Sequence, residues 1–372
     1  MQAKTPKAYL LLENGMIFEG YSFGAPAGNG VVGEVVFTTA MTGYLETLTD
    51  PSYFGQIVVQ TFPLICNYGV IPADFESSRP RLQAYIVRDW CQEPSNFRCE
   101  EDLDTFLKKM SVVGLYGIDT RALTRVVREH GVMNGMISTT AHPGEDYLMK
   151  IKAYQVENAV PSVSRHEKKT FLPEGEIKRK VVLWDFGAKA NIGRELLKRG
   201  CQVDEVDSTA TTDEILALHP DGIMLSNGPG DPAENTEIIA QLRRLMRAHI
   251  PTFGICLGHQ LLALAMGGRT EKMKYGHRGA NQPVVRSRDG RVFITSQNHG
   301  YAVLGASLPD GAYVTYTGGN DGSCEGIGYR DFPAFSVQFH PEAAGGPMDT
   351  AFLFDEFIEM MDAAIASGKG RK

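Results

Sequence analysis

Runs of apolar and polar residues divide the chain into a strand-rich first half and a second half in which strands and helices alternate. In the first half, residues 8–12 and 16–18 flank a polar Glu-Asn-Gly turn, and residues 31–38, 56–62 and 84–87 form further apolar runs. Asn-Gly between two apolar runs is typical of a β-hairpin. The pattern predicts a β-rich α+β domain at the N-terminus.

One amphipathic helix is well marked in this half, between residues 118 and 131. Asp119 or Thr120 is a candidate N-cap, and Gly131 is a candidate C-terminal stop. Apolar side chains fall on one face of this helix and arginines on the other. An arginine face can bind an acidic partner, but a solvated face is the more common arrangement and is expected here.

A charged, turn-rich stretch separates the two halves. Residues 151–179 include His-Glu-Lys-Lys and Pro-Glu-Gly-Glu, which is the composition of a linker. We therefore expect an N-terminal domain over residues 1–150 and a C-terminal domain over residues 180–372.

Strands and helices alternate in the second half. Residues 181–185 and 222–226 are apolar strand candidates, residues 201–206 are a further strand candidate, and helical patterns lie between them. A β-α-β-α order predicts a largely parallel, twisted sheet flanked by helices. Ligands of such α/β sheets bind beyond the carboxyl ends of the strands.

A cysteine follows another apolar run of this half. Residues 251–260 read Pro-Thr-Phe-Gly-Ile-Cys-Leu-Gly-His-Gln and lead directly into a helical pattern. A strand, a turn with Cys256 at its apex and a helix have the layout of a nucleophile elbow, with cysteine in place of serine. Gly254 and Gly258 allow the tight turn. The helix start places unpaired N–H groups and partial positive charge beside the sulfur, which favours the nucleophilic thiolate.

A later segment offers a base and a group to orient it. Residues 335–342 form an apolar run that ends in His340, and Glu342 follows after a proline. A Cys–His–carboxylate set follows the logic of acyl-transfer triads. A lone cysteine or histidine is more often structural. Because the elbow and this segment occur together, we predict a catalytic triad of Cys256, His340 and Glu342.

Two polar loops carry weaker signals. Residues 226–232, Ser-Asn-Gly-Pro-Gly-Asp-Pro, follow a predicted parallel strand and form either an ordinary turn or a source of oxyanion-hole donors, together with the N–H of Leu257. This loop is not a phosphate-binding P-loop, because no Gly-Lys-Ser/Thr follows. Residues 41–53 form a turn-rich stretch, for which a simple surface connection is the expectation.

Composition narrows the classes of function. The chain of 372 residues has 43% hydrophobic and 22% charged residues, which is ordinary for a soluble protein of two domains. Its net charge of −7 argues against nucleic acid as the main partner. It shows no membrane span, no signal peptide, and no disulfide or metal pattern among its six cysteines. We expect a cytoplasmic protein with reduced thiols.

The motifs of both halves resemble known families. Gly-Ile-Cys-Leu-Gly-His-Gln, Asn-Gly-Pro-Gly-Asp-Pro and His-Pro-Glu together resemble the class I (triad) glutamine amidotransferases. The first half is similar to the N-terminal domain of the carbamoyl-phosphate synthase small-subunit family, and Ser-Gln-Asn-His-Gly-Tyr at residues 296–301 matches the glutamine-site loop of that family. The motifs of the first half that carry this resemblance are Val-Val-Gly-Glu-Val-Val-Phe, Met-Thr-Gly-Tyr, Leu-Thr-Asp-Pro-Ser-Tyr and Ile-Asp-Thr-Arg.

The resemblance implies a glutaminase mechanism. Cys256 would attack the side-chain amide of L-glutamine to form a γ-glutamyl thioester, which water would then hydrolyse. His340 would carry the thiol proton to the departing ammonia, and Glu342 would orient His340. The oxyanion donors would be the backbone N–H groups of Gly228 and Leu257. The other implied glutamine contacts are Ser52 of the N-terminal domain, Gly230, Gln260, Asn298, Gly300 and Tyr301.

The resemblance also implies a partner. A large synthetase subunit, absent from this chain, would use the ammonia with bicarbonate and ATP to make carbamoyl phosphate for arginine biosynthesis, pyrimidine biosynthesis or both. The N-terminal domain would contact this subunit, in a heterodimer or a higher oligomer of heterodimers. This chain would need no cofactor or metal of its own, since ATP and a divalent metal would belong to the large subunit.

Two other functions are weighed against this one. The chain could be the glutaminase subunit of a different ammonia-using synthase, such as one for anthranilate or guanylate, but such a subunit would not need the β-rich first half. It could also be a catalytically silent regulatory subunit. The presence of Cys256, His340 and Glu342 together argues against that role.

Overall fold

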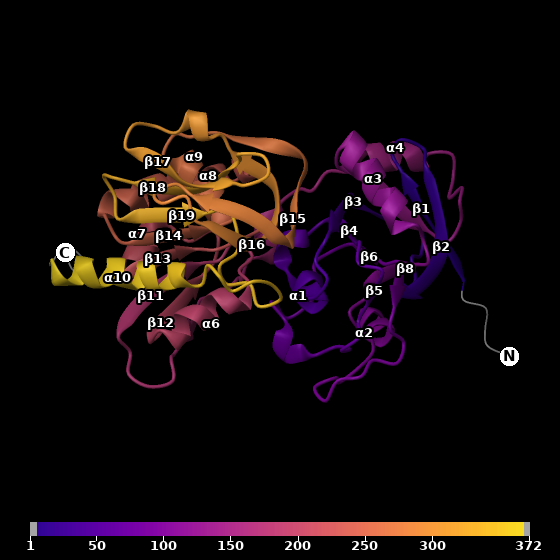
Figure 1. Ribbon diagram of the computed structural model, residues 1–372, viewed down its shortest axis with the longest axis horizontal. Helices are drawn as coiled ribbons and strands as arrows, with labels where there is room; N and C mark the ends of the chain where they lie inside the picture. The colour runs from indigo at the N-terminus through magenta and orange to yellow at the C-terminus, as the bar shows by residue number, and fades with distance from the viewer. Residues whose placement is uncertain (1–5, 368–372) are drawn as a thin grey trace. The chain divides into compact units, whose positions relative to one another are not determined.

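The computed structural model describes residues 6–367 of the chain. The chain forms two compact units, Met1–Glu157 and Asn158–Lys372 (Figure 1). The division falls within residues 151–179, the stretch with the composition of a linker. Part of that stretch is regular structure of the second unit, namely helix α5 (Ala159–Val163) and strand β10 (Lys169–Phe171).

The first unit is built around a closed β-barrel with strand order β1-β2-β8-β6-β4-β3-β9. The predicted Asn-Gly hairpin is confirmed, because β1 and β2 pair antiparallel with Leu11 opposite Ile17. The barrel closes through antiparallel pairing of β9 with both β1 and β3. Its strands are β1 (Lys7–Leu12), β2 (Ile17–Gly24), β3 (Val31–Thr38), β4 (Gln56–Gln60), β6 (Ala84–Ile86), β8 (Val113–Tyr116) and β9 (Met133–Ser138).

Short helices and a small separate sheet accompany the barrel. The predicted amphipathic helix is α3, in which the Asp119 carboxylate caps the start by accepting from the Ala122 N–H, and Gly131 follows the last turn with a φ of 95°. The other elements are α1 (Tyr44–Thr49), β5 (Leu64–Ile65), β7 (Asp89–Trp90), α2 (Leu103–Lys109), α3 (Thr120–His130) and α4 (Tyr147–Ala153).

Residues 41–53 are not the simple surface connection expected from their polarity, and that prediction is wrong. They contain α1 and a short 3₁₀ turn at Pro51–Tyr53. Leu45, Leu48 and Tyr53 are buried in the apolar core of the first unit. The helix α1 has only six residues, and polar residues separate its buried leucines. Its apolar pattern is therefore too short to be recognised in the sequence.

The second unit contains a ten-stranded sheet with the order β10-β12-β11-β13-β14-β19-β18-β16-β15-β17. Its centre is parallel, as predicted, from β12 through β11, β13 and β14 to β19. An antiparallel extension of β18, β16, β15 and β17 was not predicted. The strands are β11 (Arg179–Trp184), β12 (Cys201–Val206), β13 (Gly222–Leu225), β14 (Thr252–Ile255), β15 (Thr270–Arg286), β16 (Val292–Val303), β17 (Ala312–Gly318), β18 (Cys324–Tyr329) and β19 (Ala334–Val337).

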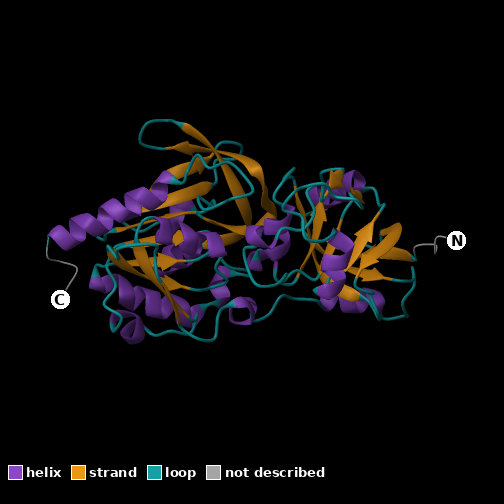
Figure 2. Cartoon of the chain, turned by 90° about the horizontal axis from the view of Figure 1, so that it is seen from below, coloured by secondary structure: helices purple, strands orange, loops and turns teal. Residues whose placement is uncertain are grey.

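Helices cover both faces of this sheet (Figure 2). Val182 and Trp184 of β11 pack with α8 and α9, whereas Val181 and Leu183 pack with α6 and α10. Successive side chains of a strand point to opposite faces, so a strand covered on both faces is apolar throughout. The helices are α6 (Ala190–Lys198), α7 (Thr212–Leu216), α8 (Thr236–Leu245), α9 (Leu257–Ala265) and α10 (Phe352–Ala366). Among the described residues, no helix has the length and apolar character needed to cross a membrane.

The parallel centre of the sheet determines where the chemistry lies. Strands β13, β14 and β19 are neighbours that run in the same direction, so their carboxyl ends share one edge of the sheet. The loop at 226–232 follows β13, Cys256 follows β14, and His340 follows β19. The fold therefore brings three sequence-distant segments to the edge where ligands of α/β sheets bind.

Packing of α10 on the sheet yields a stability prediction. The Phe357 ring is fully buried and lies against Phe253 of β14, with ring centroids 5.9 Å apart. Phe357→Ala should lower the free energy of unfolding by about 3–5 kcal/mol, because the substitution leaves a cavity. Urea unfolding of the full chain measures the loss. Glu359→Ala on the exposed face of the same helix is the control and should change stability by less than about 0.5 kcal/mol.

Candidate active site

Cys256 lies in a strained turn between β14 and α9, which confirms the predicted elbow. Its backbone has a φ of 53° and a ψ of −102°, a conformation that a residue with a side chain adopts only when its surroundings impose it. A Cβ on Gly254 would lie 2.9 Å from the carbonyl of Gly258, and a Cβ on Gly258 would lie 2.4 Å from the carbonyl oxygen of Leu225. Two glycines are therefore required for the turn to close.

Hydrogen bonds attach the elbow to both neighbouring strands. The Cys256 N–H donates to the carbonyl of Val337 at 2.9 Å, and the Gly258 N–H donates to the carbonyl of Ser226 at 3.0 Å. The Cys256 Sγ lies 3.7 Å from the carbonyl oxygen of Asn298 on β16. The elbow backbone is thus attached to β19 and to the end of β13, and its thiol lies against β16.

His340 and Glu342 form a buried pair beside the elbow. His340 Nδ1 lies 2.6 Å from Glu342 Oε1, and both side chains are almost fully buried. Burial would raise the pKa of Glu342, but His340 and Lys189 outweigh it and lower that pKa. Because Nδ1 faces the carboxylate, Nε2 is the nitrogen left for chemistry, and it has no hydrogen-bond partner among the described residues.

The charge of His340 is set by opposing neighbours. Burial and the Lys189 ammonium both lower the pKa of His340, whereas Glu342 and Cys256 raise it. The net effect is a raised pKa, so the imidazole holds its proton more firmly than an ordinary histidine. A buried imidazolium between a carboxylate and a thiol can donate a proton to a leaving group.

Two residues of the site were missed from the sequence. Lys189 Nζ lies 3.5 Å from Glu342 Oε1, and the Asn191 side-chain amide donates to the Glu342 carbonyl. Both lie at the start of α6, just beyond the carboxyl end of β11, and Lys189 is 9% exposed. Their position after a predicted parallel strand is the signal that could have identified them.

The loop after β13 lies against the start of α9. A Cβ on Gly228 would lie 2.6 Å from Leu257 Cδ2 and 2.3 Å from the carbonyl oxygen of Phe186. Gly228 and Leu257 are therefore neighbours. Leu257 is the first residue of α9, where backbone N–H groups lack intrahelical acceptors. Gly230 has a φ of 87°, which favours glycine.

The predicted glutamine contacts belong to several elements of the chain. Asn298, Gly300 and Tyr301 are part of strand β16 rather than a free loop. Gln260 lies one helical turn beyond Cys256, and its amide donates to the Tyr301 carbonyl at 2.8 Å and to Gln338 Oε1 at 2.9 Å. Ser52 belongs to the first unit, where its N–H donates to the Asp50 carboxylate at 2.9 Å. A contact between Ser52 and glutamine stays a prediction.

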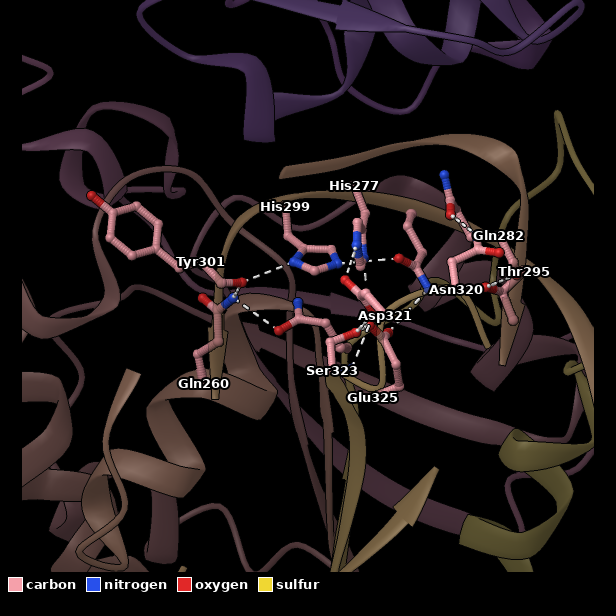
Figure 3. A network of polar contacts seen from close by, with 12 residues as sticks. Gln260, His277, Gln282, Thr295, His299, Tyr301, Asn320, Asp321, Ser323 and Glu325 are labelled. Atoms are coloured by element: carbon pink, nitrogen blue, oxygen red, sulfur yellow. Dashed lines mark hydrogen bonds and ion pairs between the residues drawn. The ribbon is translucent and has the colours of Figure 1, made fainter. Parts of the chain in front are cut away.

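One group of described side chains has the composition of a cation site. Donor atoms of His277, His299 and Glu325 lie within 4.8 Å of one another. Figure 3 shows that they belong to a larger polar network. The Glu325 carboxylate accepts from Gln297 and Ser323, so both of its oxygens have protein partners. The Glu325 oxygens and both ring nitrogens of His299 thus have protein partners, whereas His277 Nδ1 has only the Glu325 oxygen at 3.5 Å.

Comparison with known proteins covers both units. Residues 10–137 match the family model described as carbamoyl-phosphate synthase small chain, CPSase domain, and residues 182–360 match the model of glutamine amidotransferase class-I. Among solved structures, a glutamine amidotransferase from Thermotoga maritima aligns with 51% of this chain and 85% of that chain, at 19% identity and a TM-score of 0.37.

Sequence relatives extend over nearly the full length. A carbamoyl phosphate synthase small chain from Clostridium perfringens is 50% identical over 353 residues, which is 95% of this chain and 99% of the relative. A pyrimidine-specific small chain of carbamoyl phosphate synthase from Bacillus subtilis is 48% identical over 364 residues, 98% of each chain. This chain therefore belongs to the carbamoyl-phosphate synthase small-chain family, with a class I glutamine amidotransferase domain as its second half.

Proposed function

We propose that this chain is the glutaminase subunit of carbamoyl-phosphate synthase. It hydrolyses L-glutamine and supplies ammonia to a large synthetase subunit. Family membership over both units supports this role. The observation that carries it is the strained, buried Cys256 beside a His340–Glu342 pair joined at 2.6 Å, at the ligand-binding edge of the sheet.

The first half of the reaction forms a thioester. The Cys256 thiolate attacks the carboxamide carbon of glutamine, and the carbonyl oxygen becomes an oxyanion held by the N–H groups of Gly228 and Leu257. As the tetrahedral intermediate collapses, the C–N bond breaks and the His340 imidazolium donates its proton to the leaving nitrogen. Ammonia departs, and a γ-glutamyl thioester remains on the sulfur.

The second half returns the enzyme to its starting state. Neutral His340 takes a proton from water as the water oxygen attacks the thioester carbon. Collapse of this intermediate expels the Cys256 thiolate and releases glutamate, with the proton again on His340. Glu342 holds the imidazole orientation throughout, and the nearby Lys189 ammonium helps to keep Glu342 ionised.

Ammonia released here passes to the large subunit. Free ammonia is mostly protonated near neutral pH and is then no longer a nucleophile, so transfer through a sheltered route preserves its reactivity. The large subunit combines it with bicarbonate at the expense of ATP. Carbamoyl phosphate formed in this way serves arginine biosynthesis, pyrimidine biosynthesis or both. In this proposal the N-terminal unit contacts the large subunit, and Ser52 is a glutamine contact.

Replacement of the nucleophile tests the chemistry. Cys256→Ser should abolish glutamine hydrolysis, measured as glutamate released by the purified chain. Cys201→Ser is the matched control, since Cys201 is also a buried thiol of the second unit but lies on β12 in the apolar core. It should retain hydrolysis. Equal activity of the Cys256→Ser variant and the unaltered chain would exclude the thioester mechanism.

Reconstitution with a large subunit tests the role of the chain in synthesis. The unaltered chain should support carbamoyl phosphate formation from glutamine, bicarbonate and ATP. Cys256→Ser should eliminate synthesis from glutamine but leave synthesis from added ammonia intact, because ammonia bypasses the thiol. If no complex forms, or glutamine does not support synthesis, the assignment to carbamoyl-phosphate synthase fails even where hydrolysis persists.

The pH profile tests the buried pair. Glu342→Gln removes a group that raises the pKa of His340 and leaves burial and Lys189, which lower it. The His340 pKa should therefore fall, and the alkaline limb of the kcat/KM profile should move to lower pH. Activity at the optimum should drop by about a hundredfold or more, as for other triads that lose the orienting carboxylate. An unmoved alkaline limb would argue against His340 as the proton donor.

A further inference from the structure

Glu325 of β18 is a fully buried carboxylate with no part in the reaction steps above. Its Oε2 accepts from Gln297 Nε2 at 3.0 Å, and its Oε1 accepts from Ser323 Oγ at 2.8 Å. Burying a carboxylate is costly unless partners compensate it. The two hydrogen bonds offset part of this cost for Glu325.

A histidine lies between Glu325 and a second carboxyl group. His277 Nδ1 lies 3.5 Å from Glu325 Oε1, and His277 Nε2 lies 2.9 Å from Asp321 Oδ2. Burial lowers the pKa of His277, but Glu325 and Asp321 outweigh it and raise that pKa. The two carboxyl groups thus favour the protonated form of His277, while burial raises the pKa of Glu325. Figure 3 shows the three side chains close together in the polar network.

This ion-paired group touches β16 where the predicted glutamine contacts lie. Gln297, which donates to Glu325, directly precedes Asn298, whose carbonyl oxygen lies 3.7 Å from Cys256 Sγ. His299 stands opposite His277 in the β15–β16 register, and its ring lies edge-on to that of His277 with centroids 5.0 Å apart. His299 Nδ1 also lies 2.8 Å from the Tyr301 carbonyl.

We propose that Glu325, with His277 and Asp321, is a positioning group that fixes the 297–301 segment of β16 for glutamine binding. The inference rests on the proposed glutaminase function. The contact is made through the Gln297 side chain, while the backbone carbonyl of Glu325 accepts from the Gln338 N–H on the His340 side of the site. Replacing only the carboxylate therefore removes the contact with the Gln297 side chain and keeps the backbone bond between Glu325 and Gln338.

We expect a change at Glu325 to raise KM for glutamine and to leave kcat nearly unchanged. Glu325→Gln keeps the shape of the side chain but removes its charge and one acceptor oxygen, so Gln297, Ser323 and His277 compete for the remaining oxygen. Asn298 and Gly300 are predicted glutamine contacts and have no part in the proton-transfer and oxyanion steps, so their displacement should weaken glutamine binding rather than the chemical step. KM for glutamine should rise by about tenfold, with kcat within about twofold.

Two further variants keep the test decisive. Glu205→Gln makes the same change at a buried carboxylate of β12 that pairs with Arg165 at 3.0 Å, away from β16, and should leave KM unchanged. His277→Gln should raise KM like Glu325→Gln. In the double variant the rise in KM should be smaller than the product of the single effects, because one interaction is lost only once.

Amide hydrogen exchange tests the positioning without activity. Peptides covering residues 296–301 should exchange faster in Glu325→Gln and His277→Gln than in the unaltered chain, and no faster in Glu205→Gln. Unchanged exchange, or faster exchange with unchanged KM, would overturn the proposal. If the unaltered chain fails to hydrolyse glutamine, the proposed function fails. Exchange then still decides whether Glu325 holds this segment.

A metal is the competing explanation for this group. If the purified chain contains zinc in stoichiometric amount and the Glu325→Gln variant does not, this group is a metal site rather than an ion pair. That result would overturn the proposal. Purified chain with no bound zinc and an unaltered KM after treatment with a chelator would support the ion pair.

Discussion

The close approach of the Gly254 and Gly258 backbones around Cys256 is the constraint on which the active site depends. It forces the cysteine into a left-handed conformation and brings α9 against the end of β13. A side chain at either glycine would separate the helix from the sheet. The thiol, the first N–H groups of α9 and the loop at Gly228 then share one small region. Apolar packing of α9 against the sheet stabilises the fold and offsets the conformational cost of the strained Cys256 backbone.

Buried charge is the second organising feature of the second unit. Glu342 is kept ionised by His340 and Lys189, and Glu325 lies beside His277 and accepts hydrogen bonds from neutral side chains. In each case a carboxylate that would be unfavourable alone becomes acceptable through neighbours from other elements of the sheet. Strand β16 contacts both groups, because the Gln297 side chain donates to Glu325 and the Ser296 carbonyl accepts from the His340 N–H.

Local signals in the sequence were sufficient for much of the fold. The α3 helix carries its own cap at Asp119 and its stop at Gly131, and the elbow carries its glycines, so neither depends on distant contacts. Barrel closure was not predictable, because it depends on β9 pairing with β1 and β3 across the whole unit. The antiparallel extension was also missed, since β15 is largely polar and its pairing with β16 contains register shifts.

The candidate site shows the same limit of prediction from sequence. Lys189 looks like an ordinary surface lysine in the sequence until the ends of β11 and β19 are placed together. Its burial is a property of the fold rather than of its neighbours in sequence.

In the first unit, every barrel strand has two bonded neighbours. The barrel thus offers no open edge for strand addition, so recognition there must use loops and side chains, and specificity can change by surface substitution without disturbing the barrel.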